Sequence, residues 1–144
     1  MDSLIQMLAD DGCRGVARSG DGRLAVFAHS GVADMFALVT DNPSFLDGAS
    51  VADRVIGRGA ALLLVLGRVA HVYARVISTG ALGVLRDARV DVSYGTLVPH
   101  IINRAGTGVC PVEQLTAATD SPEEAYALIK QFIESHAAVV SPGA

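Results

Sequence analysis

The amino-acid sequence predicts an α/β fold: a three-layer α/β/α sandwich in which a mixed β-sheet lies between two layers of helices. Three observations support it. The chain has 144 residues, of which 51% are hydrophobic and 18% charged, a composition that excludes intrinsic disorder and supplies enough apolar side chains for one core. Two extended runs joined by a glycine-containing turn predict antiparallel pairing near the start. A strand, helix, strand succession over residues 69–97 predicts parallel pairing further on.

The chain begins with a predicted helix and a predicted β-hairpin. Residues 2–11 carry apolar side chains at an i, i+3, i+4 spacing, which is typical of a short amphipathic helix. Residues 13–18 and 23–29 are extended runs. Between them lies Ser-Gly-Asp-Gly at 19–22, whose residues readily adopt the positive φ angles of a tight turn. The two runs are therefore expected to pair as antiparallel strands.

The middle of the chain is predicted to hold a buried helix. Residues 32–39 form a shorter helical stretch, and the loop that follows over 40–48 contains proline and glycine. Over residues 51–66 apolar side chains run almost all the way round, which predicts a helix buried on every side. Gly57 and Gly59 each cost up to about 1 kcal/mol inside a helix. They indicate either close packing against another backbone or a break near Gly57, with the helix beginning after it.

The second half is predicted to continue as alternating strands and helices. Residues 69–77 and 90–97 have strand character and flank a helical stretch at 79–88, so the two strands are expected to lie parallel. Pro122 opens the last helix, with a serine before it and two glutamates in its first turn, and this helix is expected to run to residue 135.

One domain over residues 1–136 is expected, followed by a mobile tail of small residues at 137–144. Cys13 and Cys110 lie far apart without metal-binding spacing, which predicts no disulfide framework or structural zinc and favours a reducing, cytoplasmic compartment. The most apolar window, 60–66, is far shorter than the ~20 residues of a membrane span, so no membrane partner is expected. The net charge of −4 argues against generic nucleic-acid binding, which needs a basic patch.

Residues 98–114 (VPHIINRAGTGVCPVEQ) carry the densest group of polar and glycine residues. The segment follows a predicted strand end, where α/β sheets usually bind ligands. Cys110 precedes Pro111 and is expected at a helix start, which lowers the pKa of a thiol. Cys110 is therefore a candidate nucleophile, metal ligand or sulfur carrier, and Glu113 a candidate catalytic partner. The same letters also describe an ordinary helix start with Glu113 at the capping-box position, so structural roles stay open for both.

Candidate ligand-binding groups surround this cysteine. Arg104 suits an anion, because a guanidinium binds carboxylate or phosphate through two parallel hydrogen bonds, and a structural salt bridge is the alternative. The amides around Thr107 and Gly108 suit an anion too, although Gly-Thr-Gly matches no complete phosphate-binding motif. His100 suits a general base, a ligand or a hydrogen bond within its own loop. Asn103 completes this predicted set.

A second candidate segment is residues 52–61 (ADRVIGRGAA), next to the most apolar part of the chain. Asp53 and Arg58 are charged at positions close to the predicted core. Each is expected either to face a ligand-binding cleft or to form an ion pair at the surface, as Asp53 would with Arg54.

The chain resembles a known family over residues 51–67 (VADRVIGRGAALLLVLG), 72–78 (VYARVIS) and especially 97–115 (LVPHIINRAGTGVCPVEQL), continuing into SPEEAYALIKQFI. This is a small family of uncharacterised prokaryotic proteins, a domain of unknown function grouped with the cytidine deaminase-like fold. The resemblance implies a three-layer α/β/α fold with a mixed sheet.

Active zinc deaminases carry a His or Cys followed two residues later by a catalytic Glu, and a Pro-Cys-x-x-Cys motif on the next helix. This sequence departs from both patterns. None of its four histidines is followed by Glu at that spacing, and the second motif reads Cys-Pro-Val-Glu over 110–113. Standard zinc-dependent cytidine deamination is therefore not expected, and the sequence leaves open whether any reaction is catalysed.

The sequence is interpreted as a deaminase-like domain that binds a small anionic or nucleotide-like ligand through the 98–114 segment, with Cys110 as its reactive group. Two alternatives stay open. One is a divergent metal-dependent hydrolase built from Cys110, Glu113 and Asp53, and the other is a noncatalytic sulfur carrier or accessory protein. The sequence names no cofactor or metal. A homodimer is expected from the abundance of apolar residues.

Overall fold

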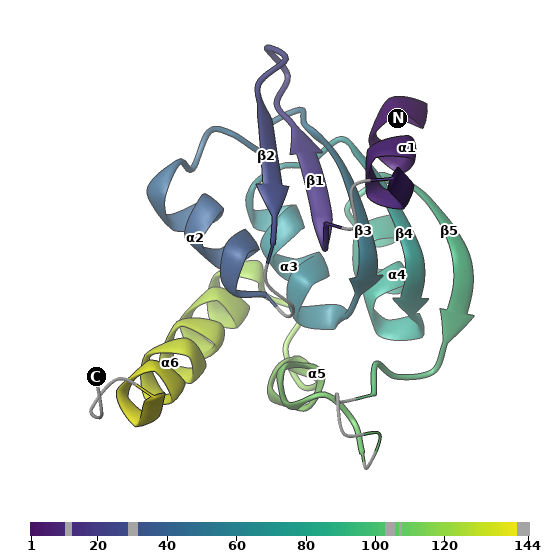
Figure 1. The fold of residues 1–144 in the computed structure, drawn as a ribbon. Helices are drawn as coiled ribbons and strands as arrows, with labels where there is room; N and C mark the ends of the chain where they lie inside the picture. Colours follow the sequence, from purple (N-terminus) through teal and green to yellow (C-terminus); the bar gives the residue numbers. More distant parts are fainter. Residues whose placement is uncertain (11–12, 29–31, 103–105, 107, 141–144) are drawn as a thin grey trace.

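The computed structural model describes residues 1–10, 13–28, 32–102, 106 and 108–140 (Figure 1). Within this part of the chain the fold is α/β, with a five-stranded sheet and six helices. The helices are α1 (Asp2–Asp10), α2 (Ala33–Asp41), α3 (Arg58–Leu66), α4 (Thr79–Asp87), α5 (Pro111–Thr116) and α6 (Pro122–Val140). The strands are β1 (Gly15–Arg18), β2 (Leu24–Phe27), β3 (Ser50–Ile56), β4 (His71–Ser78) and β5 (Asp91–Val98).

The sheet is mixed, with strand order β2-β1-β3-β4-β5. β1 pairs antiparallel with β2 and with β3, whereas β3, β4 and β5 run parallel to one another. The predicted hairpin and the predicted parallel strand pair are both confirmed. Gly22 turns the hairpin with a φ of +93°, a conformation that glycine adopts without steric cost.

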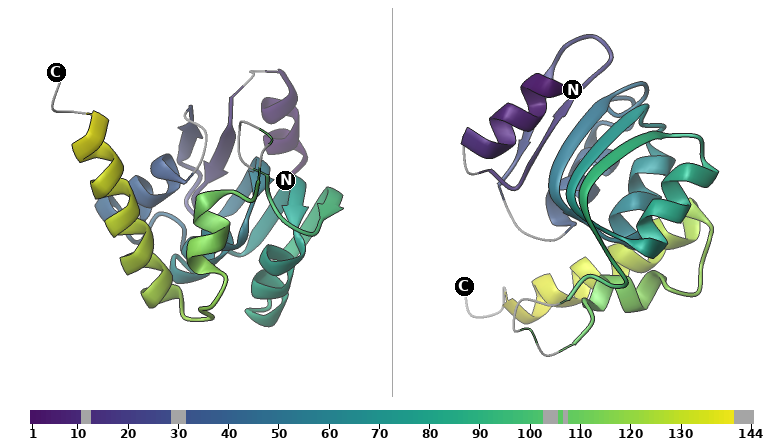
Figure 2. Two further views of the ribbon diagram at one scale, coloured as in Figure 1. Left: turned by 90° about the horizontal axis from the view of Figure 1, so that it is seen from below. Right: turned by 90° about the vertical axis from the view of Figure 1, so that its right-hand side faces the viewer.

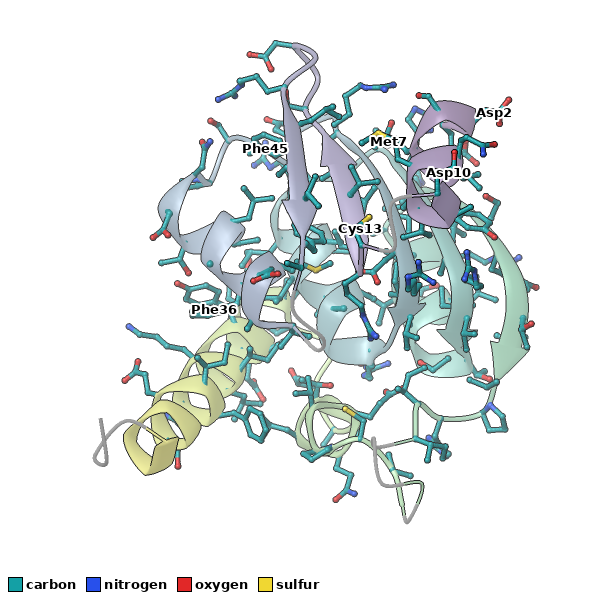
Figure 3. The ribbon with its side chains drawn as sticks, in the orientation of Figure 1. Asp2, Met7, Asp10, Cys13, Phe36 and Phe45 are labelled. Atoms are coloured by element: carbon teal, nitrogen blue, oxygen red, sulfur yellow. The ribbon has the colours of Figure 1, made fainter. Side chains whose placement is uncertain are left out.

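Helices lie on both faces of the sheet (Figure 2). α1 packs on one face against β1 and β3, and α4 packs on the other against β4 and β5. α3 lies beside α4 on that second face and also contacts α2, α5 and α6. Phe36 on α2 points toward α6, where its ring stacks on Tyr126 with 4.9 Å between ring centroids (Figure 3). No helix in the described ranges is long and apolar enough to cross a membrane.

Two clusters of buried side chains hold these layers together. The larger cluster lies between the sheet and α2, α3 and α4, with contributions from α5 and α6. The smaller one lies under α1 and consists of Leu4, Leu8, Val16 and Ala52. Each cluster contains the apolar face of an element whose other face is polar, as expected for a layered α/β fold.

The prediction of a helix over the whole of residues 51–66 is wrong for its first part, because residues 51–56 belong to strand β3. β3 lies between β1 and β4 and is covered on both faces, so buried apolar residues occur on both of its faces. Such a run cannot be told from a buried helix by its periodicity. The alternative break at Gly57 is confirmed: Gly57 is extended, with φ −96° and ψ 178°, and α3 starts after it.

The remaining elements match the predicted ones closely, with differences at their ends. α2 continues two residues past its predicted end, to Asp41. α6 begins at Pro122 as expected and continues to Val140, so part of the segment taken as a tail is helical. Residues 141–144 lie outside the described residues.

Candidate functional site

A small cavity opens toward the C-terminal end of β3, where α3 begins and α5 packs against it. Its volume is about 50 Å³. One water molecule needs roughly 10–15 Å³ of such volume, so the cavity has room for about three or four water molecules. We call it the β3 cavity. It is lined by Arg14, Val32, Met35, Asp53, Val55, Gly57, Gly59, Ala60, Ile101, Cys110, Val112 and Glu113.

Asp53 is the buried acid of the β3 cavity. It stands on the central strand β3 opposite Gly15 of β1, and only 7% of its side chain is exposed. Its Oδ1 accepts a hydrogen bond from the Val55 N–H at 3.2 Å. Burial raises the pKa of Asp53 from its ordinary value of 3.8 to about 6, although the Val55 N–H and the charges of Arg14 and Arg54 oppose that rise. This carboxyl group therefore changes its protonation state close to neutral pH.

Space for that carboxyl group depends on Gly15. A Cβ atom at position 15 would lie 3.0 Å from both Cγ and Oδ2 of Asp53 and 2.9 Å from the Phe27 ring. These separations are shorter than ordinary carbon contacts, so a larger residue at position 15 would displace the acid. The absence of a side chain at position 15 thus gives the Asp53 carboxyl group its space beside the cavity.

Arg14 is the cationic residue of the cavity, and sequence reasoning missed it. Its backbone is held between two strands, since its N–H donates to Phe27 and its carbonyl accepts from Arg54. Its Nε lies 3.7 Å from Asp53 Oδ1, too far for a hydrogen bond. Nε is buried and has no hydrogen-bond partner within the described part of the chain. No sequence pattern marks Arg14, because its neighbour Asp53 is distant in the chain and is reached only through strand pairing.

Glu113 joins α5 to α3 with its carboxylate. Oε2 accepts from the backbone N–H of Arg58 at 3.2 Å, and Oε1 accepts from the backbone N–H of Ile101 at 3.1 Å. The residue is 7% exposed. Because both oxygens already accept hydrogen bonds, the predicted catalytic residue Glu113 occupies a position suited to holding the walls of the cavity together.

Cys110 stands at the N-cap of α5, directly before Pro111, as the sequence predicts. Its side chain is a free thiol of intermediate exposure and makes no capping hydrogen bond. Its own N–H donates to the Ile101 carbonyl at 2.8 Å, so Glu113 does not close a capping box with it. Cys110 therefore lines the cavity as a partly exposed residue with a free thiol.

The predicted candidates do not all meet at the cavity. The Arg58 guanidinium turns away from it and donates to the carbonyls of Thr116 and Thr119, at 3.0 and 2.6 Å, and to Asp120. His100 is exposed and does not line the cavity. Gly108 is half-buried and is not among the lining residues. Three more predicted ligand-binding residues lie outside the described residues: Asn103, Arg104 and Thr107.

Potential metal ligands are present at the cavity but are not gathered into one site. Asp53, Cys110 and Glu113 all line it. Nevertheless, among the residues that the structure describes, no three His, Cys, Asp or Glu side chains are grouped closely enough to hold an ion together. The geometry is that of a small pocket with apolar walls and a few convergent polar groups, which is typical of ligand-binding sites.

Comparisons with known proteins agree with this architecture. The family model described as "TM1506: Domain of unknown function (DUF1893)" matches residues 3–133. The crystal structure of a DUF1893 family protein (TM1506) from Thermotoga maritima superimposes with a TM-score of 0.82 and is 27% identical. That match covers 90% of this chain and 87% of the Thermotoga chain. A search of curated proteins finds no match.

Proposed function

This chain belongs to the TM1506 family, a domain of unknown function (DUF1893), and we propose that it is a deaminase-like protein that binds a small anionic or nucleotide-like ligand at the β3 cavity. Support for a deaminase-like fold comes from the mixed sheet with helices on both faces, which is the architecture that the sequence resemblance implies. Support for ligand binding comes from the cavity itself.

One observation carries the proposal: four chemically active side chains from three separate parts of the chain line one cavity. Arg14 precedes β1, Asp53 belongs to β3, and Cys110 and Glu113 come from the start of α5. A pocket at the C-terminal end of a strand in a partly parallel sheet is also where α/β proteins usually bind ligands. Side chains far apart in sequence thus converge where a ligand is expected.

The four side chains have different proposed roles. Arg14 supplies a positive charge and an unused N–H donor, and Asp53 supplies a carboxyl group that titrates close to neutral pH. Cys110, which is partly exposed, supplies the reactive sulfur. Glu113 holds α3, α5 and the Ile101 backbone in place around them. Residues 103, 104 and 107, which lie outside the described residues, stay proposed ligand-binding residues.

The metal-dependent alternative receives less support from the geometry. Both carboxylate oxygens of Glu113 accept backbone hydrogen bonds, and a metal ion would have to displace at least one of them. A sulfur-carrier role requires an accessible thiol at Cys110, a residue that is partly exposed and also packs against the larger core cluster. The experiments below separate these possibilities.

The first test is alkylation of the two cysteines by iodoacetamide, read by mass spectrometry. Cys13 is the internal control, because it is also a partly exposed free thiol but packs with the cluster under α1 (Figure 3). We expect a mixture of nucleosides and nucleotides to slow alkylation of Cys110 and leave Cys13 unchanged. Equal alkylation of Cys110 with and without the mixture would count against ligand binding here. A Cys110→Ser variant that binds ligand as well as the parent would remove the reactive role of the cysteine.

The second test is native mass spectrometry with elemental analysis of protein purified without added metal. A copurified small molecule that is lost in an Arg14→Met variant is the expected result. Stoichiometric zinc or iron that disappears in Cys110→Ala would favour the metal-dependent hydrolase instead. An additional sulfur atom on Cys110 would favour the sulfur carrier. The same spectrum reports the number of subunits and so tests the proposed homodimer.

A further inference from the structure

The β3 cavity contains a polar pair that the fold leaves incompletely satisfied. Arg14 Nε is buried without a hydrogen-bond partner in the described part of the chain, and the Asp53 Oδ1 atom with which it forms an ion pair lies 3.7 Å away. A buried donor that is left unsatisfied loses its hydrogen bond to water without replacement and so destabilises the folded state. Such a group in a native structure requires an explanation, and an absent ligand that supplies an acceptor is one.

Asp53 offers the complementary group. It lies at the same cavity wall, more than nine-tenths buried, and one of its oxygens accepts from the Val55 N–H. As a carboxylate it accepts a hydrogen bond from a ligand N–H. Because Gly15 has no Cβ, there is room for the Asp53 carboxyl group beside β1; an added Cβ would lie only 3.0 Å from Oδ2.

Apart from Cys110 and Glu113, the rest of the wall is apolar, and the space is small. Met35, Val55 and Ala60 line it together with Ile101 and Val112. A volume of about 50 Å³ admits a group of a few atoms, not a whole nucleotide. An apolar wall favours a flat, uncharged group, because a charged group would lose its hydration without full compensation.

We propose that Arg14 and Asp53 together bind a neutral planar amide group, either a carboxamide or a lactam, whose carbonyl oxygen accepts from Arg14 Nε–H and whose N–H donates to Asp53. This inference rests on the proposed function and narrows it. The amide group is the part of the ligand that enters the cavity, while any anionic part lies outside.

The two charged alternatives fit the pair less well. A carboxylate ligand satisfies Arg14 but places its negative charge against ionised Asp53, with Glu113 lining the same cavity. An amidinium ligand satisfies Asp53 but places its positive charge against Arg14, with Arg54 on the neighbouring position of β3. An amide presents an acceptor oxygen and a donor nitrogen bonded to the same carbon and carries no net charge, so it matches both residues at once.

Three isosteric probes test the inference: acetamide, acetate and acetamidine. Each is titrated into ¹⁵N-labelled protein at about pH 7.5 and about pH 5, on either side of the Asp53 transition, and binding is read from the backbone amide shifts of Gly57, Gly59 and Ala60. Acetamide is expected to bind most tightly at the higher pH. Acetate is expected to gain affinity at the lower pH, because protonated Asp53 then donates to it. Tighter binding of acetate or acetamidine at the higher pH, or no shift with acetamide, would overturn the inference.

Variants identify the two contacts. Arg14→Met is expected to weaken acetamide binding about tenfold or more, and Arg14→Lys, which keeps the charge but loses the planar donor, is expected to restore little of it. Asp53→Asn is expected to abolish the pH dependence of acetate binding. Arg75→Met is the matched control, because Arg75 is exposed on β4. If other small molecules protect Cys110 while acetamide fails, the amide inference is wrong and the proposed ligand-binding function stands.

Discussion

Glu113 of α5 caps the first turn of α3 by accepting a hydrogen bond from the backbone N–H of Arg58, with 3.2 Å between Oε2 and the nitrogen. Gly57, at the N-cap of α3, has no side chain to do this. In return, the Arg58 guanidinium donates to the carbonyl of Thr116 at the last residue of α5, at 3.0 Å. A carboxylate near a helix N-terminus is also favoured by the helix dipole. The two helices are therefore fastened to each other by reciprocal hydrogen bonds.

Replacing Glu113 by Gln is expected to lower the free energy of unfolding by about 1–3 kcal/mol, because an amide has one acceptor oxygen where two backbone N–H groups need one each. Urea denaturation measures this loss. Glu134→Gln is the control, since Glu134 is exposed on α6 and its substitution is expected to change stability by no more than about 0.5 kcal/mol. Equal stability of the two variants would show that the Glu113 cap contributes little.

Gly59 is required for the contact between α3 and α5. A Cβ atom at position 59 would lie 2.4 Å from Val112 Cγ1, so Gly59→Ala is expected to destabilise the protein by about 1–3 kcal/mol through overpacking. The matched control is Gly83→Ala in the middle of α4, where nothing lies within 4 Å of the added atom. That change is expected to stabilise the protein by about 0.5–1 kcal/mol through helix propensity. Thermal melts of both variants should shift in opposite directions, and a shared direction would contradict the prediction.

Local signals explain which elements could be predicted from the sequence. Three features depend on a few adjacent residues and lie where the sequence predicts them. They are the hairpin turn around Gly22, the helix start at Pro122 and the N-cap position of Cys110. The sequence pattern predicts a helix over residues 51–56, where the structure has strand β3. Because β3 is covered on both faces, it lacks the alternation of apolar and polar residues that identifies a strand. The local hydrophobic pattern therefore gave the wrong prediction for a strand whose burial on both faces is determined by tertiary packing.

The residues of the candidate site also differ in whether local sequence alone could identify them. Asp53, Cys110 and Glu113 were chosen from the sequence and all line the β3 cavity. Arg14 was not chosen, because it meets Asp53 only through the register that pairs Gly15 of β1 with Asp53 of β3. Conversely, Arg58 lies between two residues that line the cavity, Gly57 and Gly59, yet its side chain points to the end of α5. Sequence can name chemically active residues, but strand pairing and side-chain direction decide which of them meet.

Arg54 holds α1 against the sheet. Its Nε donates to the carbonyl of Cys13 at 2.7 Å, and its Nη2 donates to the carbonyl of Leu8 at 2.8 Å. Arg54→Met removes both hydrogen bonds, so the amides of α1 are expected to exchange with deuterium about ten times faster or more, since each lost bond to a charged donor is worth about 1.5–3 kcal/mol. Arg75→Met on β4 is the control and is expected to leave that exchange unchanged. Faster exchange across the whole protein would point to general destabilisation and not to release of α1.

The raised pKa of Asp53 predicts that this residue makes the protein less stable as the pH rises. Burial raises the pKa from 3.8 in an exposed carboxyl group to about 6 in the folded protein. Between those two values the folded state binds more protons than the unfolded state, so the contribution of Asp53 to stability falls as pH increases through this window. At about pH 4 the folded residue is protonated and the unfolded one is partly ionised, so the cost is only about 0.5 kcal/mol. Above about pH 6 the full cost is present, which amounts to about 3 kcal/mol.

Asp53→Asn keeps the shape of the side chain and an oxygen that accepts from Val55, but it removes the charge. The variant is therefore expected to be more stable than the parent by up to about 3 kcal/mol at pH 7.5 and by no more than about 0.5 kcal/mol at about pH 4. Urea denaturation at both pH values measures the difference in the free energy of unfolding between variant and parent. The titration of all other acids is the same in the two proteins and cancels in this difference. A gain of equal size at both pH values would mean that the asparagine packs better and that burial of charge is not the cause. A loss at pH 7.5 would mean that the ion pair with Arg14 outweighs the desolvation of Asp53, and that the pKa of this carboxyl group lies below its ordinary value.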